Sequence, residues 1–257
     1  MPESETSMGK YLYCIICCSE PRQFTTLGIG ERGDVVHTVH FMDLAAVVSD
    51  SPVVEYDSSR RNMMAHTLVL EEVMKEFTIL PVRFGTIAPS VEAIENKLLK
   101  RRFGEFHGLL KEMEGRVELG LKAFWYEDVI FREILEENPP IRRLRDDLMG
   151  RRPEETYYER IRLGEMIEKA MWQKRDEDAE RILAPLRPLA YQSKVNKVIT
   201  DRMVLNAAFL VNEDRQAEFD EAVKKLDEET GKRLVFKYVG PVPPYNFVNV
   251  VVTWEES

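Results

Sequence analysis

Apolar residues in the first half of the chain alternate over short stretches and then recur at helical spacing. Alternation predicts half-buried strands, and recurrence every three or four residues predicts amphipathic helices. Ser58 or Ser59 is a suitable N-cap for one helix, and Ser90 for another. We therefore expect an α+β module. Its predicted strands cover 11–19, 35–41, 44–49 and 79–84, with a glycine-bearing loop over 22–34. Its predicted helices cover about 58–77 and 90–110. The first helix carries Met63, Leu70, Met74 and Phe77 on one apolar stripe.

The second half begins after Gly115, where residues 117–125 alternate well. The order strand–helix, helical insertion, strand–helix–strand predicts a modified ferredoxin-like sandwich with inserted helices. We expect a disordered leader over 1–9, an N-terminal α+β domain over 10–113 and this C-terminal domain over 114–257, with the insertion at about 140–195. The predicted strands of this domain cover 117–125, 202–211 and the stretch after Gly231. Its predicted helices cover 128–137, 176–189 and 216–230. A further charged helical region precedes 176 and has the inner stripe Tyr157, Ile161, Gly164, Ile167 and Met171.

A stiff interruption divides the apolar stretch from Arg233 to Val252. Gly240-Pro241 should break the strand ladder, because proline has no N–H to donate. Val242-Pro243-Pro244 should stay near polyproline II geometry, and residues 245–252 should resume as an extended segment. The resulting elbow is either an edge strand with a proline bulge or a recognition surface that presents Tyr245 and Phe247.

Composition narrows the function classes. The chain has 257 residues, a formal net charge of −9 and short basic runs only, which argues against nucleic-acid binding. No apolar run approaches the roughly 18–20 residues that span a bilayer. The polar N-terminus lacks the features of a signal peptide, so a cytosolic protein is expected. Three cysteines, an odd number, do not form a disulfide framework.

The candidate chemical motifs do not lie in the structural context that their chemistry requires. Gly28-Ile-Gly-Glu-Arg-Gly33 matches a dinucleotide fingerprint, but a strand pattern follows instead of a helix, so we interpret it as a flexible turn. Cys14 and Cys17 should face opposite ways on a strand, as should His37 and His40. The three cysteines, Cys14, Cys17 and Cys18, are therefore expected to be buried small hydrophobic residues, and neither a metal nor a cofactor is expected.

Two further candidates remain. Glu165 and Glu168 lie one helical turn apart and could pair as acid and base, although charged helix faces produce such pairs by chance. Arg83 ends an apolar strand just before Phe84-Gly85. Its guanidinium could donate to carbonyls or to a carboxylate of the neighbouring domain in a capping ion pair, or it could contact a partner.

Four stretches together resemble one family. They are Leu80-Pro-Val-Arg-Phe-Gly-Thr86, Arg160-Ile-Arg-Leu-Gly-Glu165, Met203-Val-Leu-Asn-Ala-Ala-Phe-Leu-Val211 and Gly240-Pro-Val-Pro-Pro-Tyr-Asn-Phe-Val248. In this order, and spread over nearly the whole chain, they are similar to the gas vesicle GvpL/GvpF family. The resemblance implies two domains, the second ferredoxin-like.

The resemblance also implies a non-enzymatic accessory protein needed to form gas vesicles. It implies contact with the small hydrophobic shell subunit (GvpA type) and with other accessory gas vesicle proteins, in the cytoplasm before assembly and at the vesicle afterwards. We expect Pro243, Pro244, Tyr245 and Phe247 to form part of the partner-binding surface, with Arg83 in support. The alternative is a small-molecule sensor or an enzyme on a ferredoxin-like fold, because that fold hosts many functions.

Overall fold

The computed structural model describes residues 7–254, so the leader expected over 1–9 lies mostly outside the described residues. Met8 and Gly9 already belong to the first strand. The chain forms two compact units, one built from the chain up to Glu118 together with the segment from Pro241 onward, and the other from Leu119 to Gly240. The domain limits drawn from the sequence stay a prediction, and the structure groups the proline-rich elbow with the first unit.

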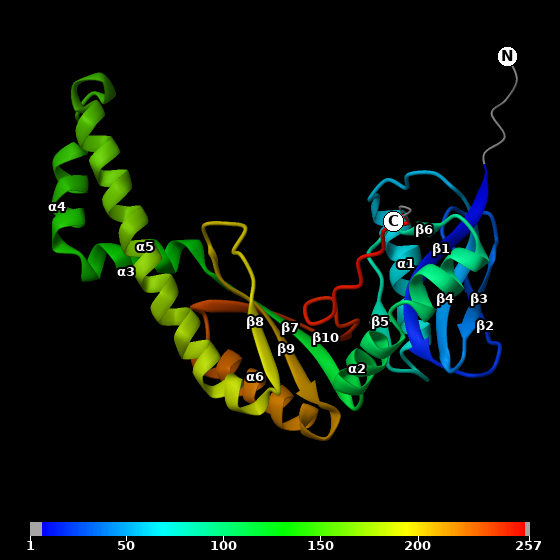
Figure 1. Cartoon of the computed structure of the whole chain (residues 1–257). Helices are drawn as coiled ribbons and strands as arrows, with labels where there is room; N and C mark the ends of the chain where they lie inside the picture. Colours follow the sequence, from blue (N-terminus) through cyan, green and yellow to red (C-terminus); the bar gives the residue numbers. More distant parts are fainter. Residues whose placement is uncertain (1–6, 255–257) are drawn as a thin grey trace, which may run out of the picture. The chain divides into compact units, whose positions relative to one another are not determined.

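An antiparallel sheet with the strand order β2-β3-β4-β1-β5 organises the first unit (Figure 1). Strand β6 pairs with β1 beside this path. A register shift between Leu12 and Cys14 marks a bulge in β1 where it pairs with β4. The elements of this unit are β1 (Met8–Cys17), β2 (Gln23–Leu27), β3 (Val35–Phe41), β4 (Leu44–Pro52), α1 (Arg60–Val73), β5 (Ile79–Pro81), β6 (Ile87–Ala88), a π-helix (Ala93–Lys100) and α2 (Phe103–Met113).

Helix α1 packs against the sheet. Ser59 caps its N-terminus, where its side chain accepts a hydrogen bond from the Asn62 N–H at 3.4 Å. The buried side chains of α1 are His66, Val69, Leu70 and Val73. The stripe expected from the sequence is therefore only partly right, because Met63 is 41% exposed. The core cluster that contains Val69, Leu70 and Val73 also includes Tyr11, Tyr13, Cys14 and Ile16 of β1.

The strand order of the second unit is β10-β7-β9-β8 (Figure 1). Helix α6 packs on this sheet, since the Phe209 and Phe219 rings lie 5.0 Å apart. Gly231 ends α6 with a positive φ of 53°, a conformation that glycine adopts without strain. The elements are β7 (Arg116–Trp125), α3 (Glu127–Glu137), α4 (Pro139–Leu148), a 3₁₀ turn (Pro153–Thr156), α5 (Tyr157–Leu186), a 3₁₀ turn (Arg187–Leu189), β8 (Gln192–Val195), β9 (Met203–Asn212), a 3₁₀ turn (Glu213–Arg215), α6 (Gln216–Thr230) and β10 (Leu234–Val242).

Two expectations for this unit were wrong. The region predicted as two helices, with a second one from 176, is the single helix α5 of 30 residues. No glycine or proline between Gly164 and Pro185 interrupts it, and most of its charged residues are Glu, Lys and Arg, which are good helix formers. The predicted inner stripe also fails at its start, because Tyr157, Ile161 and Gly164 are exposed and only Met171 is buried.

Candidate functional site

The elbow folds back on the first unit as a turn. Strand β10 runs through Gly240-Pro241 and ends at Val242, so the predicted break falls later than expected. Pro243 and Pro244 are buried. The Val248 N–H then donates to the Pro244 carbonyl at 2.8 Å, which closes the turn. The segment 245–252 was expected to resume as a strand, but it forms only one isolated parallel bridge, between Val250 and Val82.

A buried carboxylate fixes the tip of this turn. Glu118 of β7 is 3% exposed and accepts hydrogen bonds from the backbone N–H of Asn246 at 2.9 Å and from its Nδ2 at 2.5 Å. Charge-assisted bonds of this kind are stronger than neutral ones. The turn is therefore anchored on both sides of Tyr245, its exposed aromatic residue. No sequence pattern had indicated a role for Glu118.

Tyr245 lies at the edge of a largely apolar hollow of about 310 Å³, which we call the Arg83 hollow. The structure brings two of the proposed partner-binding residues, Arg83 and Tyr245, together at this place. The other three do not line it: Pro243 and Pro244 are buried and Phe247 is half-buried. Within residues 7–254, the lining consists of Met63, Thr67, Pro81, Arg83, Phe84, Tyr245, Val248, Asn249 and Val250.

Two family-like stretches that are distant in sequence meet at the Arg83 hollow. Leu80–Thr86 contributes Pro81, Arg83 and Phe84, and Gly240–Val248 contributes Tyr245 and Val248. Met63 and Thr67 come from the exposed side of α1. Met63 belongs to the helical stripe expected from the sequence, which is only partly buried.

A hydrogen-bond chain holds Tyr245 from beneath. The Gly85 N–H donates to the Tyr11 hydroxyl oxygen at 3.0 Å, and His66 connects Tyr11 to Tyr245 through bonds of 3.0 Å at Nδ1 and 2.9 Å at Nε2. Tyr11 is fully buried, so its O–H needs an acceptor, which the His66 Nδ1 atom provides. The Nε2–H then donates to the Tyr245 hydroxyl oxygen, and no described residue accepts a hydrogen bond from the Tyr245 O–H.

Burial keeps the members of this chain uncharged. Desolvation lowers the pKa of His66 to about 4, and it raises the pKa values of Tyr11 and Tyr245. The imidazole therefore stays neutral at pH 7, in the state with one donor and one acceptor that the hydrogen-bond chain requires. The structural role of His66 depends on contacts that folding creates, so no local sequence pattern indicated it.

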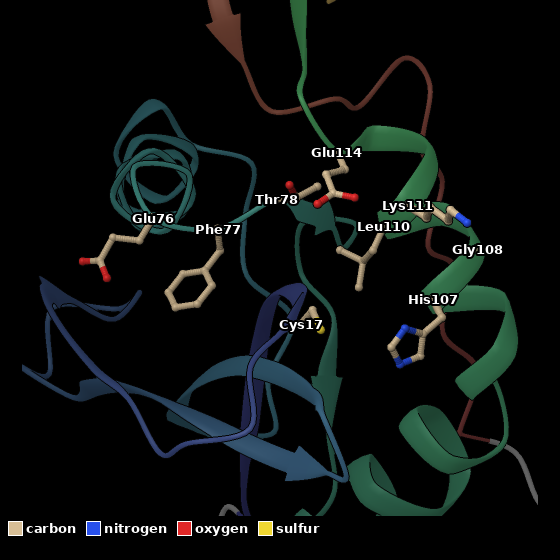
Figure 2. Close-up of a pocket in the computed structure, with 9 residues that line it drawn as sticks. All are labelled: Cys17, Glu76, Phe77, Thr78, His107, Gly108, Leu110, Lys111 and Glu114. Carbon is tan, nitrogen blue, oxygen red and sulfur yellow. The ribbon is translucent and has the colours of Figure 1, made fainter. Parts of the chain in front are cut away.

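A second, larger hollow of about 590 Å³ lies in the same unit (Figure 2). Phe77, Leu110, Cys17 and His107 surround its centre, whereas Glu76 and Lys111 point away from it (Figure 2). Cys17 is exposed, which corrects the expectation that all three cysteines are buried; Cys14 and Cys18 are. Burial and the Asp43 carboxylate raise the pKa of the Cys17 thiol, so this thiol is not activated as a nucleophile.

The remaining sequence candidates do not assemble into a reactive site. The glycine-bearing stretch from Gly28 forms a turn that leads into β3 and not into a helix, although strand β2 occupies part of the loop predicted over 22–34. Glu165 and Glu168 are exposed on α5. Within residues 7–254, no group of three or more histidine, cysteine, aspartate or glutamate side chains has an arrangement suited to a metal ion.

No helix among the described residues is long and apolar enough to cross a bilayer.

Comparisons with known proteins agree on one family. A family model described as "Gas vesicle synthesis protein GvpL/GvpF" matches residues 9–249. Gas vesicle protein F of Streptomyces sp. is 32% identical over 94% of this chain and 100% of its own length, and gas vesicle protein F of Dolichospermum flosaquae is 27% identical over 95% and 99%. The crystal structure of GvpF from Anabaena sp. PCC7120 superposes with a TM-score of 0.82 at 26% identity, covering 96% of this chain and 100% of that one.

Proposed function

Because the chain belongs to the GvpL/GvpF family of gas vesicle proteins, we propose that it is a non-enzymatic assembly factor that binds the small hydrophobic shell subunit (GvpA type). In this role it works in the cytoplasm with other accessory gas vesicle proteins and remains at the vesicle afterwards. Shell subunits expose apolar surface before they assemble and are at risk of aggregation. A folded partner that covers such a surface would protect them.

The observation that carries this proposal is the meeting of two family-like stretches at the Arg83 hollow. The hollow is apolar, and Tyr245 is 42% exposed at its edge, on a turn that Glu118 and His66 hold in place. Rigid aromatic residues at the edge of an apolar depression are efficient contact residues, because little conformational entropy is lost on binding. In this account Arg83, Tyr245 and Phe247 contact the partner, and Pro243 and Pro244 support them from within the fold.

The architecture of the second unit supports a finer assignment of its fold. Its elements follow the order β7-(α3, α4, α5)-β8-β9-α6-β10, and its strands are arranged β10-β7-β9-β8. We propose to class it as a ferredoxin-like sandwich in which the first crossover is enlarged by α3, α4 and α5.

The alternative of a sensor or enzyme has less support. Its expected sign is a deep pocket with convergent polar groups and titrating residues shifted toward reactivity. In the larger hollow the pKa of the Cys17 thiol is raised, which is a shift away from reactivity. The charged side chains of Glu76 and Lys111 point away from the centre of this hollow (Figure 2). We therefore keep the binding function as the conclusion.

A pull-down with the purified shell subunit tests the proposal. The variant Tyr245→Ala plus Phe247→Ala should lose most of the bound shell subunit, while circular dichroism and the melting temperature show that it is folded. Tyr158→Ala is the matched control, because it removes an aromatic side chain that is 81% exposed on α5 and distant in sequence from the elbow. Wild-type binding by a folded double variant would remove the elbow from the account.

A further inference from the structure

Among the residues that the structure describes, Arg83 is the only charged side chain that lines the Arg83 hollow, and no carboxylate lines it. The sign of this charge is opposite to that of the whole chain, whose formal net charge is −9. A partner segment that enters the hollow therefore meets an apolar surface with one positive charge at its edge.

The Arg83 guanidinium is exposed and makes no ion pair or hydrogen bond with any residue that the structure describes. Only its backbone is engaged, since the Thr86 N–H and Oγ1–H donate to the Arg83 carbonyl at 3.3 and 2.6 Å. The capping ion pair expected from the sequence is thus absent among residues 7–254. By contrast, Arg102 of the same unit binds Glu105 through Nε and Nη2, at 2.8 and 2.6 Å.

Tyr245 supplies a second donor at the same hollow. Its oxygen accepts from His66, so its O–H is not used within the hydrogen-bond chain. Burial raises its pKa, so the phenol keeps this proton at neutral pH. A guanidinium and a phenol O–H beside one apolar surface are suited to a carboxylate that adjoins an apolar side chain.

We propose that the Arg83 hollow binds an internal acidic-apolar segment of its partner, with an apolar side chain in the hollow and a neighbouring Asp or Glu carboxylate bound by Arg83 and Tyr245. The inference rests on the proposed function, in which the segment belongs to the shell subunit. A volume of about 310 Å³ suits one or two side chains.

The geometry favours a side-chain carboxylate over a chain terminus. Terminal carboxylates are commonly captured by clusters of backbone N–H groups. Two nearby backbone N–H groups are already occupied, since Gly85 donates to Tyr11 and Thr86 donates to the Arg83 carbonyl.

Methyl NMR on the full-length chain with labelled methionines provides the test, because Met63 lines the hollow and its methyl group reports occupancy. Met63→Leu assigns its signal. The probes are three N-acetylated peptides: Leu-Glu-Leu amide, Leu-Gln-Leu amide, and Leu-Gln-Leu with a free terminal carboxylate. We expect the glutamate peptide to bind about fivefold more tightly than the glutamine amide, as for a partly exposed charge-assisted contact. Arg83→Gln should remove this preference, and Tyr245→Phe should reduce it.

The matched control is Arg101→Gln, which removes an exposed arginine charge outside the hollow and should leave the preference unchanged. Equal affinity of wild type for the glutamate and glutamine amides would overturn the inference, as would a preference that persists in Arg83→Gln. Tighter binding of the free-carboxylate peptide than of the glutamate peptide would overturn the choice of an internal segment.

The pull-down separates this inference from the proposed function. If Arg83→Gln retains the shell subunit while the double elbow variant loses it, the carboxylate contact fails and the proposed function stands. If the peptide preference depends on Arg83 but wild type retains no shell subunit, the hollow has the inferred specificity and the shell subunit is the wrong partner.

Discussion

The imidazole of His66 connects the buried core of the first unit to its surface. It is 1% exposed, and its hydrogen-bond partners are two tyrosines, with no charged group bonded to either nitrogen. The Tyr13 and Phe84 rings pack beside it, with centroids 5.5 and 5.6 Å from its own. A protonated imidazole in this place would be desolvated and would lose its acceptor role, which explains why the pKa is lowered to about 4.

This shift predicts a pH dependence of stability. As pH falls from 6.5 to about 4, the unfolded chain binds a proton at His66 that the folded chain does not, so the free energy of unfolding decreases. The loss at the acidic end is roughly 3 kcal/mol, at about 1.4 kcal/mol per unit of pKa difference. Urea unfolding of wild type and His66→Gln across this range measures it.

His66→Gln should be less stable than wild type at pH 7.5 but should have a flatter pH profile. His37→Gln, at a half-buried histidine of β3, should keep the wild-type slope. Equal slopes for wild type and His66→Gln would contradict the assignment of this titration to His66.

At the scale of elements, strand β2 shows how a helix secures a sheet edge. Glu72 of α1 accepts hydrogen bonds from the Thr25 and Thr26 N–H groups, both at 2.8 Å, and from the Thr25 Oγ1 at 2.7 Å. Partial burial acts to raise the pKa of Glu72, but these hydrogen bonds outweigh it and lower the pKa to about 2. The ionised carboxylate is therefore the form that holds the edge strand.

We expect Glu72→Gln to destabilise β2 by about 1 kcal/mol, since an amide accepts these bonds more weakly and with one oxygen only. Because the folded pKa is depressed, this contribution is present above the unfolded value near 4.5 and is lost as pH falls toward 2. Amide hydrogen exchange at Thr25 and Thr26 should become faster in the variant at neutral pH. Glu71→Gln, at the exposed neighbouring position, should leave this exchange unchanged.

The sequence largely predicted which segments form helices and strands. It predicted less well where each element begins and ends and which of its faces is buried. The α6 limits, 216–230, and the β3 limits, 35–41, were confirmed because their patterns end at clear signals such as Gly231. Strand β2 was missed because its five residues are exposed or half-buried and carry little pattern of their own. The α1 and α5 faces were misjudged, since periodicity shows that a stripe exists but not which neighbour covers it.

At the scale of the whole molecule, each compact unit depends on contacts between distant residues. In the second unit, the buried Asp178 carboxylate of α5 accepts from Trp125 Nε1 at 2.8 Å and from Arg233 Nη2 at 2.7 Å. Arg233 also binds Glu133 of α3, at 2.7 and 2.9 Å. Burial acts to raise the Glu133 pKa, but the hydrogen bonds and charges of Arg233 and Lys174 together outweigh it, so the net shift is downward. One cluster thus joins β7, α3, α5 and the residue that precedes β10.

Asp178→Ala should lower the free energy of unfolding by about 3 kcal/mol, because it leaves the buried Trp125 indole N–H without an acceptor and removes one of the two carboxylates that bind the partly buried Arg233 guanidinium. Chemical denaturation followed by tryptophan fluorescence measures the change, and Trp125 is itself a reporter at this place. Asp176→Ala, at an exposed position of the same helix, is the control and should change stability by less than about 0.5 kcal/mol. A loss for Asp178→Ala as small as that of the control would show that the cluster contributes little.

By itself, the sequence determined the family, the α+β class and most elements, because motifs, capping residues and hydrophobic period are local properties of the chain. It also named Arg83 and Tyr245, one as a charge at the end of an apolar strand and the other as an aromatic residue on a stiff elbow. Only the tertiary structure brought these two residues to one hollow, placed His66 beneath Tyr245 and buried Pro243 and Pro244. Burial, pairing and pKa depend on neighbours that folding brings from distant positions, and no local pattern encodes them.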